Sequence, residues 1–142
     1  MITLPGFIDL HTHTRYPDFD SFDYKQIEKS AMIGGYSNIL AMPNSKQPIH
    51  NIDNLNLARK IDNLMNLNIC RTGALTKNLE GQELVDFEKF IQNGVYIFTD
   101  DGKSLVDDSL ADKAFKEVAR LGGAIFQHCE INCHTNPGDI AP

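Results

Sequence analysis

The stretch Phe7-Ile8-Asp9-Leu10-His11-Thr12-His13 places two histidines directly after a short apolar run. Such a run is typical of a β-strand, and residues two positions apart on a strand point to the same face. Both imidazoles can therefore reach one metal ion at the strand end, and imidazole nitrogen suits Zn²⁺ at about 2.0–2.1 Å. We expect His11 and His13 to be metal ligands.

Similar runs recur at a steady interval along the chain, at residues 7–10, 37–42, 68–72, 95–99 and 124–127. Between them, apolar residues recur three and four positions apart, which is the period of an amphipathic helix. Glycines precede the later strands and are typical of helix ends, and Asp107, Asp108 or Ser109 is suited to begin the last helix. The pattern predicts an α/β fold of about five parallel strands alternating with helices.

Two architectures share this alternation: an open doubly wound sheet and part of an eight-stranded (β/α) barrel of TIM type. The interval between strands does not separate them. A dinucleotide-binding fold requires a GxGxxG turn after the first strand, and the sequence has none.

Polar residues gather just after the predicted strands, where parallel α/β folds build their sites. Asn44 follows the second strand, the pair Asp100-Asp101 follows the fourth, and His128 with Glu130 follows the fifth. This ordered placement favours a functional site at one edge of the sheet.

Composition excludes several partners. The chain has 142 residues and a net charge of -6, without a run of Lys or Arg, so nucleic acid and anionic membranes are poor candidates. No apolar run approaches the roughly 20 residues that span a bilayer. Three cysteines without a CxxC pair suit a reducing, cytoplasmic location better than a disulfide framework.

Five motifs in order resemble the class I dihydroorotases of the amidohydrolase superfamily. Residues 5–13 with Arg15 are similar to the PGFIDxHxHxR signature that opens the catalytic barrel of that family, and Met42-Pro43-Asn44 is similar to its MPN segment. Residues 72–76, the segment Asp100-Asp101-Gly102 and the segment His128-Cys129-Glu130 match later motifs. Tyr16-Pro17-Asp18 departs from the family, which has EPG there.

The resemblance implies a role for each matching residue. His11, His13, Asp101 and His128 would bind Zn²⁺, with Asp101 preferred over Asp100, while Glu130 would be structural or support the ligands. Arg15 and Asn44 would hold the carboxylate of a small-molecule substrate. The reaction would be the reversible hydrolysis of dihydroorotate to N-carbamoyl-aspartate in pyrimidine synthesis. A hydantoinase-like reading is disfavoured, because those enzymes carry a lysine where this sequence has Thr99-Asp100-Asp101.

The resemblance also implies that residues 1–142 are the N-terminal half of the barrel, without strands six to eight and without the flanking β-sandwich. No catalytic base is then expected in the chain, because the family takes it from an aspartate after the eighth strand. We expect little activity from the chain alone, and exposed strand edges that favour self-association. The alternatives are one half of a split enzyme, which needs a complementing chain, and a non-catalytic partner-binding module.

Overall fold

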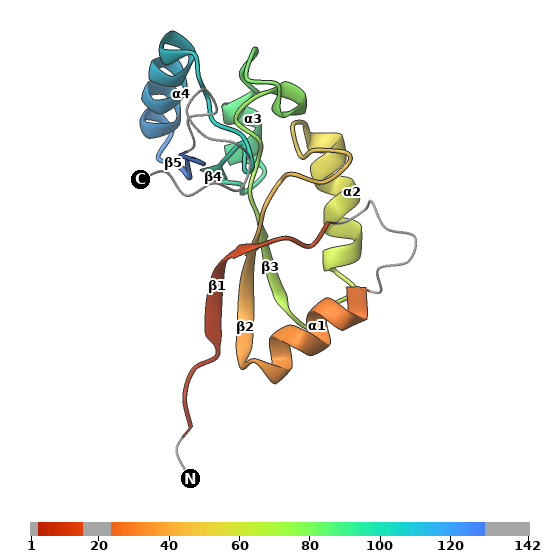
Figure 1. Ribbon diagram of the computed structural model, residues 1–142. Coiled ribbons are helices and arrows are strands. Elements are labelled where there is room, and N and C mark those ends of the chain that lie inside the picture. The colour runs from red at the N-terminus through yellow and green to blue at the C-terminus, as the bar shows by residue number, and fades with distance from the viewer. Residues whose placement is uncertain (1–2, 16–23, 130–142) are drawn as a thin grey trace, which may run out of the picture.

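The computed structural model describes residues 3–15 and 24–129. Within these ranges the chain alternates strands and helices as the sequence predicts (Figure 1). The strands are β1 (Phe7–Thr12), β2 (Tyr36–Ala41), β3 (Asn68–Arg71), β4 (Ile97–Phe98) and β5 (Ala124–Ile125). The helices are α1 (Tyr24–Ile33), α2 (Ile52–Asp62), α3 (Phe87–Gln92) and α4 (Asp108–Arg120), with a short 3-10 turn η1 (Lys77–Leu79). The predicted α/β class is confirmed.

All strand pairs are parallel. β1, β2 and β3 form one sheet in that order, and β4 pairs with β5 in a second. A parallel bridge between Gly73 and Phe98 links the two sheets, since the Gly73 amide donates to Ile97 and its carbonyl accepts from Thr99. The strand order therefore follows the chain. A doubly wound sheet instead reverses its order at a switch point, and the described strands show no such reversal.

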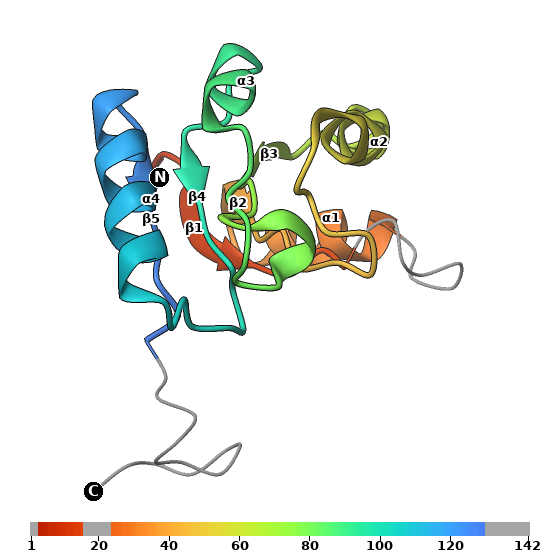
Figure 2. The same cartoon turned by 90° about the horizontal axis from the view of Figure 1, so that it is seen from above.

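The helices lie outside the strands. Viewed from above, α1, α2, α3 and α4 are arranged around the strands in chain order (Figure 2). None of the helices in the described ranges is long and apolar enough to cross a membrane.

Helix boundaries follow local chemistry. α4 begins at the cap residue Asp107, whose carboxylate accepts from the backbone amides of Ser109 and Leu110 and thereby satisfies two otherwise unpaired donors. The chain leaves α3 and α4 through Gly94 and Gly122, both with left-handed backbone angles that favour glycine. α3 is shorter than the sequence period predicts, because Leu84 pairs with Thr76 in an isolated bridge before the helix begins.

The buried core lies between α2, α3, α4 and the strands that they cover. Phe98 of β4 is fully buried and meets the rings of Phe87 and Phe90 edge-on, with ring centroids 4.8 and 5.8 Å away. β1 contrasts with this core. Phe7, Ile8 and Leu10 are each about 60% exposed, and β1 has a single described neighbour in the sheet.

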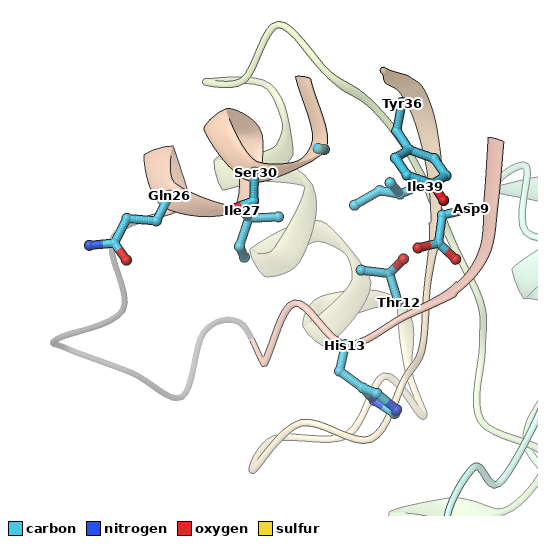
Figure 3. A pocket seen from close by; sticks show the side chains of 9 residues that line it. Asp9, Thr12, His13, Gln26, Ile27, Ser30, Tyr36 and Ile39 are labelled. Carbon is cyan, nitrogen blue, oxygen red and sulfur yellow. The ribbon is translucent and has the colours of Figure 1, made fainter. Parts of the chain in front are cut away.

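A hollow of about 370 Å³ lies between α1 and the strands β1 and β2. Figure 3 shows Gln26, Ile27 and Ser30 of α1 on one side of it, with Asp9 and Tyr36 on the other. His13 lies at its edge, with the imidazole directed away from Thr12 and Asp9. The hollow is therefore separate from the group of residues that His13 joins.

Candidate metal centre

Three predicted ligands meet at the ends of β1 and β4. The Nε2 atom of His11 lies 3.3 Å from Oδ1 of Asp101, and the Nε2 atom of His13 lies 3.4 Å from Oδ2 of the same carboxylate. The two imidazole rings are 5.1 Å apart between centroids. Among the described residues, His11, His13 and Asp101 form a group whose ligand atoms all lie within 4.8 Å of one another.

The strand geometry explains this convergence. His11 and His13 come from the end of β1, where the pairing with β2 becomes irregular between Asp9 and Thr12. The backbone amide of His11 donates to the Asp9 carboxylate within this irregular part of the strand. Asp101 follows β4 and is 8% exposed, whereas the side chains of His11 and His13 are 53% and 34% exposed. A buried carboxylate thus faces two accessible imidazoles.

The donor set suits a metal ion. Two nitrogen ligands bound at about 2.0–2.2 Å to a tetrahedral zinc lie roughly 3.4 Å from a bound carboxylate oxygen. The His–Asp separations of 3.3 and 3.4 Å are of this size, but each histidine faces a different oxygen of the carboxylate, and the ligand atoms of the group lie within 4.8 Å of one another. The three side chains are therefore close enough to share one ion after a small movement.

The neighbouring aspartate has a different environment. Asp100 is 3% exposed, and its Oδ1 accepts from the backbone amides of Leu75 and Thr76 while Oδ2 bonds the Thr76 hydroxyl. Burial raises the pKa of Asp100, and the hydrogen bonds from Thr76 and Leu75 oppose that shift. The Asp100 carboxylate is therefore bound to the segment after β3, and it is Asp101 that faces the histidines.

His128 lies at the margin of the group. Its Nδ1 atom is 3.9 Å from Oδ1 of Asp101, and its backbone carbonyl accepts from the Ser104 hydroxyl. It is not among the three residues whose ligand atoms lie mutually within 4.8 Å. Glu130 and the segment Tyr16-Pro17-Asp18 lie outside the described residues.

Arg15 and Asn44 are joined to each other and to the ligands. The Arg15 guanidinium donates from NH1 to the backbone carbonyl of Asn44 at 2.9 Å. The Asn44 amide nitrogen donates to Oδ2 of Asp101 at 2.7 Å and to its backbone carbonyl at 3.1 Å, while Oδ1 of Asn44 lies 3.0 Å from Nδ1 of His13. Sequence reasoning placed Asn44 near the site but did not foresee these contacts.

A buried ion pair below the site was also missed. Arg71 of β3 donates to both carboxylate oxygens of Asp62 and, through NH1, to the hydroxyl of Thr14, the residue between His13 and Arg15. The pair holds the segment after β1 against β3 and α2. A signal was present in the sequence, because Arg71 ends an otherwise uncharged strand.

Comparison with known proteins identifies the family of the chain. Residues 1–141 match the family model described as dihydro-orotase-like. Proteins named dihydroorotase are similar to the chain: that of Aquifex aeolicus is 36% identical over 92% of this chain and 31% of its own length. The protein of Shouchella clausii is 32% identical over 99% of this chain and 33% of its own length, and that of one Staphylococcus epidermidis strain is 34% identical over 90% and 31%. The chain spans about a third of the length of these curated relatives. The chain belongs to the dihydro-orotase-like family.

Proposed function

We propose that this chain carries the metal site of a cyclic amidohydrolase that interconverts dihydroorotate and N-carbamoyl-aspartate. The observation that carries the proposal is the approach of two imidazoles, His11 and His13, to the buried Asp101 carboxylate at 3.3 and 3.4 Å. Family membership and the name of the relatives support the substrate class. As the chain spans about a third of those relatives, the activity is proposed for the whole protein.

The fold supports a barrel origin for residues 1–142. Parallel strands in chain order, with a helix after each of the first four and a bridge between β3 and β4, match the first half of a (β/α)8 barrel. Sites in such barrels form where strands end. His11 lies near the end of β1, and His13, Asn44 and Asp101 follow β1, β2 and β4.

His11, His13 and Asp101 would hold a zinc ion, with His128 as a further ligand. Bound there, zinc would lower the pKa of a coordinated water to about 7 and polarise the amide carbonyl of the substrate. Burial of Asp101 supports this assignment, because a charged group removed from water is stabilised by a cation.

Arg15 and Asn44 would lie against the substrate carboxylate, with the Arg15 guanidinium as its donor, because the Asn44 amide donates to Asp101. A guanidinium presents a planar fork of donors that matches a carboxylate, and NH1 of Arg15 uses one donor on the Asn44 carbonyl. Arg15 has a positive φ of 51°, an uncommon value outside glycine that occurs at functional sites. This backbone directs the guanidinium toward the segment after β2.

A non-catalytic module or one half of a split enzyme remains the alternative. Exposed Phe7, Ile8 and Leu10 on β1 favour pairing of this edge with a second copy or with a complementing chain. Cys70 and Cys129 are free thiols in the described part of the chain, which suits a reducing setting such as the cytoplasm.

Metal retention tests the site directly. The purified chain is loaded with Zn²⁺, desalted and analysed for metal content, beside the His11→Ala and His13→Ala variants and a His50→Ala control. His50 is suited as the control because its Nε2 bonds Asn51 and it is not in the metal-ligand group. We expect the first two variants to lose the metal and the control to retain it.

Retention of a full equivalent by both His11→Ala and His13→Ala would refute the metal site. Binding of N-carbamoyl-aspartate to the zinc-loaded chain, measured by calorimetry, tests the substrate class. Binding of equal strength to the Arg15→Ala variant would contradict the assigned carboxylate contact.

A further inference from the structure

Asn44 contacts two of the proposed ligands at once, which is more than a substrate contact requires. Its amide nitrogen donates to Oδ2 of Asp101 and its amide oxygen faces Nδ1 of His13. We propose that Asn44 is a positioning residue for the metal site, which fixes the ring orientation and tautomer of His13 and the direction of the Asp101 carboxylate. This inference rests on the proposed metal site.

The orientation of the amide follows from its partners. The Asn44 nitrogen lies 2.7 Å from Oδ2 of Asp101 and 3.1 Å from the Asp101 backbone carbonyl. A backbone carbonyl oxygen can only accept a hydrogen bond, so the group that faces it must be the amide NH₂. The other end of the side chain, toward His13, is therefore the carbonyl oxygen.

The tautomer of His13 follows in turn. A carbonyl oxygen can only accept, so at 3.0 Å Nδ1 of His13 must carry the proton and donate it. In the neutral imidazole this leaves the lone pair on Nε2, which is the atom 3.4 Å from the Asp101 carboxylate. Ligand histidines in metalloproteins are oriented in this way by a partner on the second ring nitrogen.

Asn44 itself is held in place. The Arg15 guanidinium donates a hydrogen bond to the backbone carbonyl of Asn44. The partly buried side-chain amide of Asn44 lies close to Gly102, because a Cβ added to that glycine would be 3.7 Å from the amide nitrogen. The side chain of Asn44, which follows β2, thus contacts both the end of β1 and the segment after β4. Among the described residues, no side chain bonds Nδ1 of His11 in the way that Asn44 bonds Nδ1 of His13.

The test compares Asn44→Ala with Asn56→Ala, a matched control on the exposed face of α2. Affinity for Zn²⁺ is measured by competition with a chromogenic chelator, without any substrate. Loss of a partner that orients a ligand typically costs 10–100-fold in metal affinity. We expect a loss in that range for Asn44→Ala and an unchanged affinity for the control. A residue that served only the substrate carboxylate would leave the affinity for metal alone unchanged, and that result would overturn the proposal.

A second measurement gives a wild-type result that does not depend on the folding of Asn44→Ala. Nitrogen-15 spectra of the histidine rings in the metal-free wild-type chain, assigned with His11→Ala and His13→Ala, report which ring nitrogen carries the proton. We expect Nδ1–H for neutral His13, and in Asn44→Ala a shift toward the mixed tautomers of a solvated imidazole, with His11 unaffected. Neutral His13 found as the Nε2–H form in the wild type would overturn the proposal.

Failure of the proposed metal site and failure of the proposed role of Asn44 give different results. If the wild-type chain binds no Zn²⁺, the proposed function fails, while the ring spectra still decide the tautomer. If the wild-type chain binds Zn²⁺ and Asn44→Ala binds it equally well, the metal site stands and the positioning role of Asn44 is refuted.

Discussion

We predict that removing the carboxylate of Asp62 strongly lowers the free energy of unfolding, because Asp62 holds a buried ion pair beneath the site. Asp62 is the last residue of α2 and accepts from Nε and NH2 of Arg71 at 2.9 and 2.6 Å. The side chain of Arg71 is 1% exposed and that of Asp62 is 8% exposed. Asp62→Ala would leave the Arg71 charge in the core, with the hydroxyl of Thr14 as its remaining side-chain partner among the described residues.

The expected magnitude follows from burial. Breaking one partner of a buried ion pair costs about 3–5 kcal/mol, because the other charge stays desolvated and unpaired. Folded domains are stable by only about 5–15 kcal/mol, so this change consumes a large share of the total. The exposed pair Asp112–Lys116 on α4 has the same 2.6 Å separation, with side chains 58% and 75% exposed. Asp112→Ala should cost no more than about 0.5 kcal/mol.

Urea unfolding followed by far-ultraviolet circular dichroism gives the free energy of unfolding of each variant by linear extrapolation. The double variant Asp62→Leu, Arg71→Met removes both charges and should cost clearly less than Asp62→Ala, because no buried charge is left without its partner. The reasoning is refuted if Asp62→Ala costs as little as Asp112→Ala, or if the double variant is the less stable of the two.

Three further predictions concern the rest of the fold. Hydrogen bonding, chiefly from the backbone amide of Leu110, lowers the pKa of the cap residue Asp107 below its usual 3.8. Asp107 therefore stabilises α4 above about pH 3.8 and loses this effect as the pH falls through its lower folded-state pKa. The difference in free energy of unfolding between wild type and Asp107→Ala should become smaller in acid. A difference that stays constant with pH would contradict this. A Cβ at Gly123 would lie 2.9 Å from the backbone carbonyl of Tyr96, so Gly123→Ala should cost about 1–3 kcal/mol in urea unfolding; an unchanged midpoint would show that the backbone yields. Ile8→Lys on the exposed edge strand should reduce self-association in sedimentation velocity, and an unchanged mass distribution would exclude β1 as the contact.

The alternation of elements could be read from the sequence because it is a local property. Apolar runs and helical periods depend on neighbouring residues, and all five predicted strands are strands in the structure. The cap at Asp107 and the left-handed glycines after α3 and α4 are local too, since each is set by the few residues around it. The lengths of β4 and β5 were not predictable in this way, because pairing with a neighbour decides where a parallel strand ends.

The sequence predicted part of the candidate site, beginning with the histidine pair. Spacing alone put His11 and His13 on one face, and the order of motifs placed Asn44, Asp101 and His128 after their strands. Which of these residues meet was decided by packing. His11, His13 and Asp101 form a close group, while His128 lies at its edge.

The adjacent aspartates mark the limit most clearly. Asp100 and Asp101 are chemically identical neighbours, and the sequence favoured Asp101 as the ligand only through the family resemblance. The physical difference lies in the tertiary structure, where Asp100 accepts from the amides of Leu75 and Thr76 and Asp101 faces the histidines. The contacts of Asn44 with His13 and Asp101 likewise join residues 31 and 57 positions apart. The sequence by itself determined which elements form and which residue types follow each strand, because those depend on nearby residues. Only the tertiary structure decided which atoms face one another, because hydrogen-bond partners are chosen by three-dimensional packing of segments that are distant in the chain.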